Sequence, residues 1–295
     1  MDKRVILTGA SGFIGRNLLL KLIKNNFDVI TISRNPIEFY SNKHKNIIYK
    51  NSYESLITQF DKIPIYSVIH LATYFLQNHN SSQVSQLINS NLLFGNHLLE
   101  LTKELNINSF INTSTYAQSV NGISYDPQNL YTATKEAFEK IIKFYNLTIP
   151  TTKFITLELF DTYGYNDSRP KFINLLLKSI VNGEDFKMSE GNQEISYQFI
   201  DDVTDAYLSC LTNQIENVTP FGSKYSIFNG EVYKLKDLAN IINESTGKRI
   251  KILEGFYPYR HREIMTIKAN YEILPNWTPK TDLLQGVSKI LNYEQ

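Results

Sequence analysis

A tyrosine and a lysine spaced four residues apart offer acid–base chemistry. Tyr131 and Lys135 open residues 130–146, a stretch with helical spacing of apolar side chains, so the phenol and the ammonium share one helix face. The positive charge of Lys135 favours the phenolate and is expected to lower the pKa of Tyr131 toward a useful range. Such a pair can exchange a proton with a substrate oxygen, and the lysine can also hold a nucleotide ribose.

A second candidate group is the polar run Asn112-Thr113-Ser114-Thr115, which closes an apolar stretch before this helix. A hydroxyl from this run can hydrogen-bond a substrate oxygen next to Tyr131 and stabilise developing charge. The alternative is that these side chains only satisfy their own backbone. We favour the catalytic interpretation for the run as a whole.

A glycine-rich turn near the start of the chain predicts a phosphate site. Thr8-Gly9-Ala-Ser-Gly12-Phe-Ile-Gly15 follows an apolar run and precedes a helical pattern. Gly9 permits a tight turn, Gly12 lets the backbone approach a pyrophosphate, and Gly15 allows close packing of helix and strand. The helix N-terminus then supplies amide donors and partial positive charge, so the turn predicts dinucleotide binding rather than a purely structural role.

The end of the second predicted strand discriminates between cofactors. An NAD site usually has Asp or Glu at this position to bind the ribose hydroxyls. Here the position is Ser33, followed by Arg34, whereas Asp28 stands at the start of the strand, where a solvated surface role is expected. A guanidinium pairs with a 2′-phosphate, so the pattern favours NADP(H), with NAD as the alternative.

Alternating strands and helices must position these groups. The predicted fold is α/β, a Rossmann-type doubly wound parallel sheet with helices on both faces. In open α/β sheets ligands bind outside the carboxyl ends of the strands, so the turn and the catalytic pair should share one edge. Strands are predicted at 4–8, 28–33, 46–50, 66–71, 109–113 and 153–159, with helices at 13–24, 82–105 and 130–146.

The pattern changes after Tyr163-Gly164 and predicts a smaller C-terminal α+β lobe over the edge of the sheet. Residues 1–165, with parts of 200–230, are assigned to the NADP-binding domain, and 166–295 mostly to a substrate-binding lobe. Residues 254–262 are aromatic and basic without clear periodicity. Helices are predicted at 170–181, 202–211 and 235–246, with short strands near 197–200 and 225–228.

Composition excludes several classes of protein. The chain has 295 residues, 42% of them hydrophobic, and a net charge of +1, so it is not a general binder of nucleic acid. The single cysteine, Cys210, excludes an internal disulfide framework, and no metal cluster is indicated. No run approaches the roughly 20 apolar residues of a membrane span, and no signal segment precedes the first strand. We expect a cytoplasmic enzyme.

These residues together resemble the extended short-chain dehydrogenase/reductase family, the NAD-dependent epimerases and dehydratases that act on nucleotide sugars. The resemblance covers essentially the whole chain and places Thr115 on the family's catalytic Ser/Thr position, with Ser114 as a possible substitute. The matching segments are Thr8 to Gly15, His70-Leu-Ala72, Asn91, Thr113 to Thr115, Tyr131 to Lys135, Tyr163-Gly164, Gly191-Asn-Gln193, Phe199-Ile-Asp-Asp202 and Tyr225 to Gly230.

Departures from the family pattern narrow the function. Family dehydratases have an Asp-Glu type pair directly after the catalytic Ser/Thr, but this chain has Tyr116-Ala117-Gln118, which argues against dehydration. The family's substrate-phosphate Asn falls on Asp161, and an Arg that is common before Phe-x-x-x-Asp-Asp falls on Ile195. Replacement contacts to the substrate diphosphate are expected from Arg169, Lys171, Arg260 or Arg262.

The segments 159–164, 169–171 and 257–263 look like the 4-reductases of deoxysugar pathways, a group that includes the CDP-abequose and CDP-paratose synthases. The resemblance implies NADPH-dependent reduction of the C4 ketone of a nucleotide-linked 4-keto-6-deoxyhexose. One alternative is an NAD-dependent nucleotide-sugar 4-epimerase, which uses the same residues. An alternative of another class is a non-catalytic NADP-binding regulator that kept only the fold.

The expected roles can be assigned by residue. Many relatives form a homodimer through the two long helices, and Leu92, Leu93, Leu98 and Leu101 permit this, although they serve equally to pack on the sheet. The catalytic residues are Tyr131, Lys135 and Thr115. The cofactor contacts are Gly9, Ser11, Gly12, Phe13, Ile14, Gly15, Ser33, Arg34, Leu71, Ala72, Thr73, Asn91, Thr113, Tyr131, Lys135, Phe160 and Thr162, and the substrate contacts are Thr73, Thr115, Asp161, Arg169, Lys171, Arg260 and Arg262.

Overall fold

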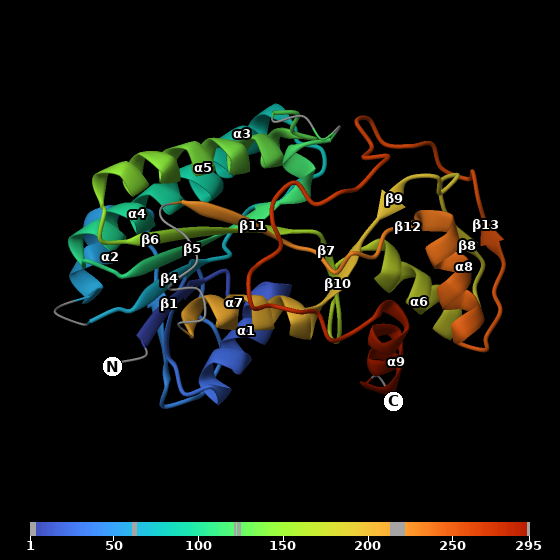
Figure 1. Ribbon diagram of the computed structural model, residues 1–295, viewed down its shortest axis with the longest axis horizontal. Helices are drawn as coiled ribbons and strands as arrows, with labels where there is room; N and C mark the ends of the chain where they lie inside the picture. The colour runs from blue at the N-terminus through green and yellow to red at the C-terminus, as the bar shows by residue number, and fades with distance from the viewer. Residues whose placement is uncertain (1–3, 61–63, 121, 123–124, 213–221, 294–295) are drawn as a thin grey trace.

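A seven-stranded sheet forms the centre of the computed structural model, which describes residues 4–60, 64–120, 122, 125–212 and 222–293 (Figure 1). The strand order is β11-β6-β5-β4-β1-β2-β3, and every neighbouring pair is parallel. This order is that of a Rossmann-type doubly wound sheet, so the predicted fold class is confirmed. The strands are β1 (Arg4–Thr8), β2 (Asp28–Ser33), β3 (His44–Ile48), β4 (Ser67–His70), β5 (Ser109–Thr115), β6 (Lys153–Leu159) and β11 (Ser223–Ile227).

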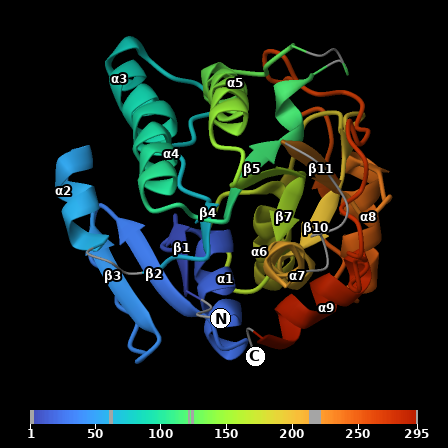
Figure 2. The same cartoon turned by 60° about the vertical axis from the view of Figure 1, so that its left-hand side comes forward.

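Helices cover both faces of this sheet (Figure 2). On β1, Val5 and Leu7 pack into one apolar cluster and Ile6 into another, and all three are fully buried. A strand that is buried on both faces needs such a continuous apolar run. Helices α1 (Phe13–Lys24) and α7 (Ile200–Leu211) cover one face, and α4 (Phe94–Glu104) and α5 (Leu130–Thr148) cover the other.

The predicted helix over 82–105 is wrong as a single regular element. A 3₁₀ turn at Ser81–Gln83 leads into α3 (Val84–Ile88), a π-helical turn at Asn89–Leu93 and then α4. The π turn carries the buried Asn91, which accepts a hydrogen bond from the Tyr74 backbone N–H at 2.7 Å. A π turn inserts a residue into a helix and often marks a functional site. Here it directs a polar side chain toward the segment after β4.

The C-terminal part of the chain forms a smaller lobe beside the sheet (Figure 1). Its apolar core includes Leu176 and Leu238, and Phe13 at the start of α1 also packs into it. The lobe is therefore tied directly to the glycine turn. Its elements are β7 (Asp161–Tyr163) with β10 (Tyr197–Phe199), β9 (Glu194–Ile195) with β12 (Tyr233–Lys234), β8 (Phe186–Lys187) with β13 (Ile252–Leu253), and helices α6 (Phe172–Asn182), α8 (Leu235–Ser245) and α9 (Leu283–Tyr293).

Several elements were not predicted from the sequence. They are α2 (Tyr53–Ile57), α9 and the short strands β7, β8, β9, β12 and β13, and β3 begins two residues before the predicted strand. Strands of two or three residues are too short to show a hydrophobic period. They exist because partner segments of the lobe pair with them.

The proposed domain boundaries and the homodimer stay predictions. β11 lies in the main sheet, within the predicted range 200–230, and residues 213–221 of that range lie outside the described residues. Of the four leucines considered for a dimer, Leu98 and Leu101 are fully buried in this chain's own core, whereas Leu93 is 41% exposed. Over the described residues, no helix is both long and apolar enough to cross a bilayer.

Candidate active site

One cavity of about 1620 Å³ runs from the glycine turn across the ends of β4, β5 and β6 into the lobe. Small-molecule sites usually measure about 300–1,000 Å³, so this cavity has room for more than one ligand. The strand ends meet at this edge because the sheet is parallel. Of the predicted site residues, the cavity is lined by Gly9, Ser11, Gly12, Phe13, Ile14, Gly15, Ser33, Arg34, Leu71, Ala72, Thr73, Thr113, Thr115, Tyr131, Lys135, Phe160, Asp161, Thr162, Arg169, Lys171 and Arg260.

The glycine turn brings backbone segments closer together than side chains would allow. Gly9 has φ +71°, and a Cβ there would lie 2.7 Å from the Ala72 backbone nitrogen. A Cβ on Gly15 would overlap the Gly9 carbonyl, and the Gly12 N–H donates to that same carbonyl at 2.9 Å. The turn thereby presents the N-terminus of α1 to the cavity. These residues fit the pyrophosphate of a dinucleotide cofactor.

The end of β2 carries no carboxylate toward the cavity. The Ser33 hydroxyl donates to the Asn35 carbonyl at 2.7 Å, and the exposed Arg34 follows it on the cavity lining. Asp28 lies at the other end of the strand, where its Oδ2 atom is 3.7 Å from Nη2 of Arg4. The acidic residues among the described lining all lie at or beyond Asp161 in sequence.

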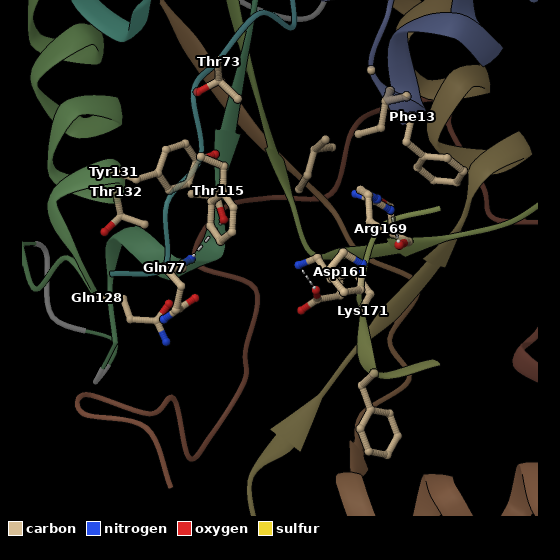
Figure 3. Close-up of a pocket in the computed structure, with 18 of the residues that line it drawn as sticks. Phe13, Thr73, Gln77, Thr115, Gln128, Tyr131, Thr132, Asp161, Arg169 and Lys171 are labelled. Carbon is tan, nitrogen blue, oxygen red and sulfur yellow. Dashed lines mark hydrogen bonds and ion pairs between the residues drawn. The ribbon is translucent and has the colours of Figure 1, made fainter. Parts of the chain in front are cut away.

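Tyr131, which Figure 3 shows, and Lys135 lie one helical turn apart at the start of α5, and both line the cavity. The Asn129 side chain caps this helix by accepting from the Thr132 N–H at 3.0 Å, which fixes the helix start beside Tyr131. Lys135 is 4% exposed, and its ammonium donates to the Thr113 carbonyl at 3.0 Å. The Lys135 side chain thus joins the start of α5, which also carries Tyr131, to the end of β5.

Burial controls the protonation of this pair. It raises the pKa of Tyr131 to about 12, and a hydrogen bond with the Thr73 hydroxyl offsets this only in part. Burial also lowers the pKa of Lys135 to about 8, against the opposing effect of the Glu139 carboxylate. The predicted lowering of the Tyr131 pKa by Lys135 is therefore wrong for this structure, because loss of hydration dominates. Tyr131 is a protonated phenol, which suits a proton donor.

The hydroxyls at the end of β5 have different surroundings. Ser114 donates to Glu139 Oε1 at 2.6 Å, and the Thr113 hydroxyl pairs with Tyr207 at 2.7 Å. The Thr115 hydroxyl accepts from the backbone N–H groups of the next turn, Ala117 at 3.4 Å and Gln118, and lies on the cavity side with Tyr131 (Figure 3). Thr115 is therefore better placed than Ser114 to meet a substrate oxygen. We refer to Thr115, Tyr131 and Lys135, the three predicted catalytic residues, as the catalytic wall.

Asn91 lies behind the cavity lining rather than on it. Its Oδ1 accepts from the Thr73 hydroxyl at 3.1 Å, and its Nδ2 donates to the Tyr74 carbonyl at 3.1 Å and to the Thr134 hydroxyl at 3.0 Å. The amide is thereby fully used within the protein. Asn91 thereby holds the segment after β4 against α5. The predicted direct contact between Asn91 and the cofactor stays a prediction.

Opposite the catalytic wall lies a group of paired charges, Asp161, Arg169 and Lys171 (Figure 3), which we call the cationic wall. Asp161 accepts from the Lys171 ammonium at 3.0 Å and from the Tyr116 hydroxyl at 2.9 Å. The nearby positive charges and these bonds hold the pKa of Asp161 below its usual range despite burial. Asp161 is therefore a carboxylate where the family pattern has an amide.

The remaining predicted basic residues lie in different surroundings. Arg169 stacks over the Phe13 ring at 4.3 Å and donates to Asp167 at 2.7 Å, so it joins the glycine turn to the lobe. Arg262 forms an ion pair with Asp126 and does not line the cavity. Arg260 does line it. Of the two arginines in the 257–263 segment, the geometry thus favours Arg260 as the substrate contact.

Sequence reasoning missed Phe75, which lies between the two walls. Its ring meets the Tyr131 ring edge-on, with the centroids 5.0 Å apart, and Lys171 Nζ lies 5.7 Å from the Phe75 centroid. The side chain is 49% exposed and lines the cavity. Its position just after β4, at the binding edge of the sheet, is the signal that points to it.

Comparisons with known proteins agree with this geometry. The model of the NAD dependent epimerase/dehydratase family matches residues 5–227. A CDP-abequose synthase of Salmonella typhimurium is 30% identical over 99% of this chain and 98% of its own length, and one of Salmonella muenchen is 29% identical over 100% and 99%. The solved UDP-glucose 4-epimerase of Thermotoga maritima superposes with a TM-score of 0.83 at 20% identity, over 99% of this chain and 98% of that one.

The chain therefore belongs to the NAD dependent epimerase/dehydratase family. It is an enzyme of the oxidoreductase type within the extended short-chain dehydrogenase/reductases. The sequence-based assignment to this family is confirmed.

Proposed function

We propose that this enzyme uses NADPH to reduce the C4 ketone of a CDP- or dTDP-linked 4-keto-6-deoxyhexose. The observation that carries the proposal is a continuous cavity that joins the glycine turn to Tyr131, Lys135 and Thr115 and continues into the lobe. The similarity to CDP-abequose synthases over nearly the full chain supports the nucleotide-sugar substrate. Residues 1–165 would hold the cofactor, and the lobe would hold the sugar nucleotide.

The catalytic wall can complete such a reduction. When bound, the reduced nicotinamide supplies a hydride to C4. Tyr131 then gives its phenolic proton to the oxygen at C4, so that the C=O bond becomes CH–OH and the tyrosine is left as phenolate. The buried Lys135 ammonium balances that negative charge, and the Thr115 hydroxyl donates to the same oxygen.

The residues after Thr115 support reduction rather than dehydration. The Tyr116 hydroxyl is committed to Asp161, and burial together with that carboxylate raises the pKa of Tyr116 well above its usual range. The Gln118 amide donates to Glu136 at 2.7 Å and to Glu139 at 2.9 Å, so its hydrogen bonds are made within the protein. Neither side chain is a carboxylic acid that can remove a proton and expel water from a hexose.

The choice of NADPH rests on Ser33 and Arg34 at the end of β2. Replacing Arg34 with Ala is expected to weaken NADPH binding about tenfold while NADH binding changes little, because a charge-assisted bond to the 2′-phosphate is lost. Fluorescence titration with both cofactors measures this. Equal losses for the two cofactors would contradict the assignment, and wild-type preference for NADH would do so directly.

The proposed chemistry is tested by Tyr131→Phe. The variant should lose about 10³-fold in turnover, because the proton donor is gone, while NADPH affinity changes less than about twofold. Steady-state NADPH oxidation and fluorescence binding give the two values. Full activity in this variant would overturn the assigned role of Tyr131.

A further inference from the structure

A buried ion pair lies behind the catalytic wall, outside the proposed reaction. Lys224 of β11 donates to both carboxylate oxygens of Glu139 on α5, at 3.0 and 2.9 Å. Both side chains are only 11% exposed. The Lys224 ammonium also lies 4.5 Å from the centroid of the Tyr271 ring. A buried pair is expensive to desolvate and weak evidence for stability by itself, which directs attention to what else it contacts.

The same carboxylate reaches the end of β5. Glu139 Oε1 accepts from the Ser114 hydroxyl at 2.6 Å and from Gln118 Nε2 at 2.9 Å. The Oε1 atom of Gln118 in turn accepts from the backbone N–H of Thr115, at 3.3 Å. A continuous path of hydrogen bonds therefore connects Glu139 to the backbone of Thr115, which lines the cavity.

Glu139 also follows Lys135 by one helical turn. Residues i and i+4 share a helix face, and the charge of Glu139 opposes the burial that lowers the pKa of Lys135. Among the described residues, Glu139 is the one group whose charge shifts the pKa of Lys135. Burial lowers the pKa of His70, on β4, to about 3, and burial raises the pKa of Tyr207, on α7, well above its usual range. With Tyr131 protonated as well, Glu139 is the anion and Lys224 its second cation.

We propose that Glu139 is a positioning residue that serves as the counter-charge of Lys135 and, clamped by Lys224, fixes the strand end that carries Thr115. The expected effect of Glu139 on turnover rests on the proposed function. Its expected effect on the pKa of Lys135 does not. The proposal assigns opposite effects to the two members of the pair. Loss of Glu139 removes a negative charge near Lys135, and loss of Lys224 removes a positive charge while leaving the carboxylate.

The direct test is the titration of Lys135 followed by the NMR shift of its Cε in [ε-¹³C]lysine-labelled protein, with Lys135→Arg to assign the signal. In Glu139→Gln the midpoint should fall by about one pH unit, and in Lys224→Met it should rise by about half a unit. Lys143→Met, an exposed site on α5, is the matched control and should leave the midpoint unchanged. Equal midpoints in all variants, or shifts in the same direction, would overturn the proposal.

A conservative variant separates charge from structure. Glu139→Asp keeps the negative charge, so its Lys135 midpoint should stay within a few tenths of the wild-type value even if the shorter side chain lowers the melting temperature. If the Lys135 midpoint falls as far in Glu139→Asp as in Glu139→Gln, the charge of Glu139 does not set the pKa of Lys135. The titration needs no substrate, so absence of reductase turnover would count against the proposed function and leave this result standing.

Discussion

The two walls of the cavity hold their charges in opposite ways. On the catalytic wall, the Lys135 ammonium is buried and bonds a backbone carbonyl, with its counter-charge one turn away behind the surface. On the cationic wall, Lys171 and Arg169 already have carboxylate partners, Asp161 and Asp167, close to the cavity. In the first arrangement the Lys135 ammonium has, among the described residues, no carboxylate in direct contact, so its charge can stabilise negative charge that develops on Tyr131 during the reaction. The second neutralises its cations before any ligand arrives.

This difference predicts that the two walls contribute to different kinetic constants. A ligand that contacts Lys171 must share it with Asp161, so the net gain from each contact is small, as it is for other partly exposed pairs. The contacts of the catalytic wall are made beside the buried Lys135 ammonium, where charge that develops during reaction is stabilised more strongly than in water. Changes to the catalytic wall should therefore act on kcat, and changes to the cationic wall on KM.

The largest effect in this comparison is expected from Thr115→Val. Loss of one donor to the developing oxyanion should lower kcat about 100-fold, with little change in KM. Steady-state kinetics of NADPH oxidation measures both. Thr115→Ser keeps the hydroxyl and should recover most of the activity. If the serine variant is as poor as the valine variant, the hydroxyl is not the contributing group.

A smaller effect is expected on the opposite wall. Lys171→Met should raise KM for the nucleotide sugar about tenfold with kcat within about twofold, because a charge-assisted bond to the ligand is lost and Asp161 loses its cationic partner. NADPH affinity should not change. Lys140→Met, which removes an exposed lysine of α5, is the control. A loss confined to kcat would mean that Lys171 belongs with the reacting groups.

The smallest effect is a shift in pH dependence. Because burial lowers the pKa of Lys135 to about 8, the ammonium that supports the Tyr131 phenolate is lost as pH rises through that value. We expect kcat/KM to fall above about pH 8. Lys135→Arg, which stays protonated, should extend whatever activity it retains to higher pH. If kcat/KM stays constant up to pH 10, deprotonation of Lys135 does not limit the rate.

Local motifs explain why the sequence predicts one wall better than the other. The glycine turn and the Tyr131–Lys135 spacing are set by neighbours along the chain, so the sheet order and these residues follow from periodicity and strand-end geometry. The pairing of Asp161 with Lys171 depends on how β7 meets the segment before α6. The clamp of Glu139 by Lys224 joins residues 85 positions apart, which no local pattern reveals. The π turn at Asn91 is hidden for the same reason.

The central claim is net reduction at C4, and one measurement tests it most directly. Purified enzyme is supplied with NADPH and CDP-, dTDP-, GDP- or UDP-linked 4-keto-6-deoxyhexoses, and absorbance at 340 nm is followed together with sugar analysis. The account predicts one NADPH consumed for each CDP- or dTDP-linked sugar converted to its 4-hydroxy product. Interconversion of C4 epimers without net NADPH oxidation, or cofactor binding with no turnover of any of these sugars, would contradict it.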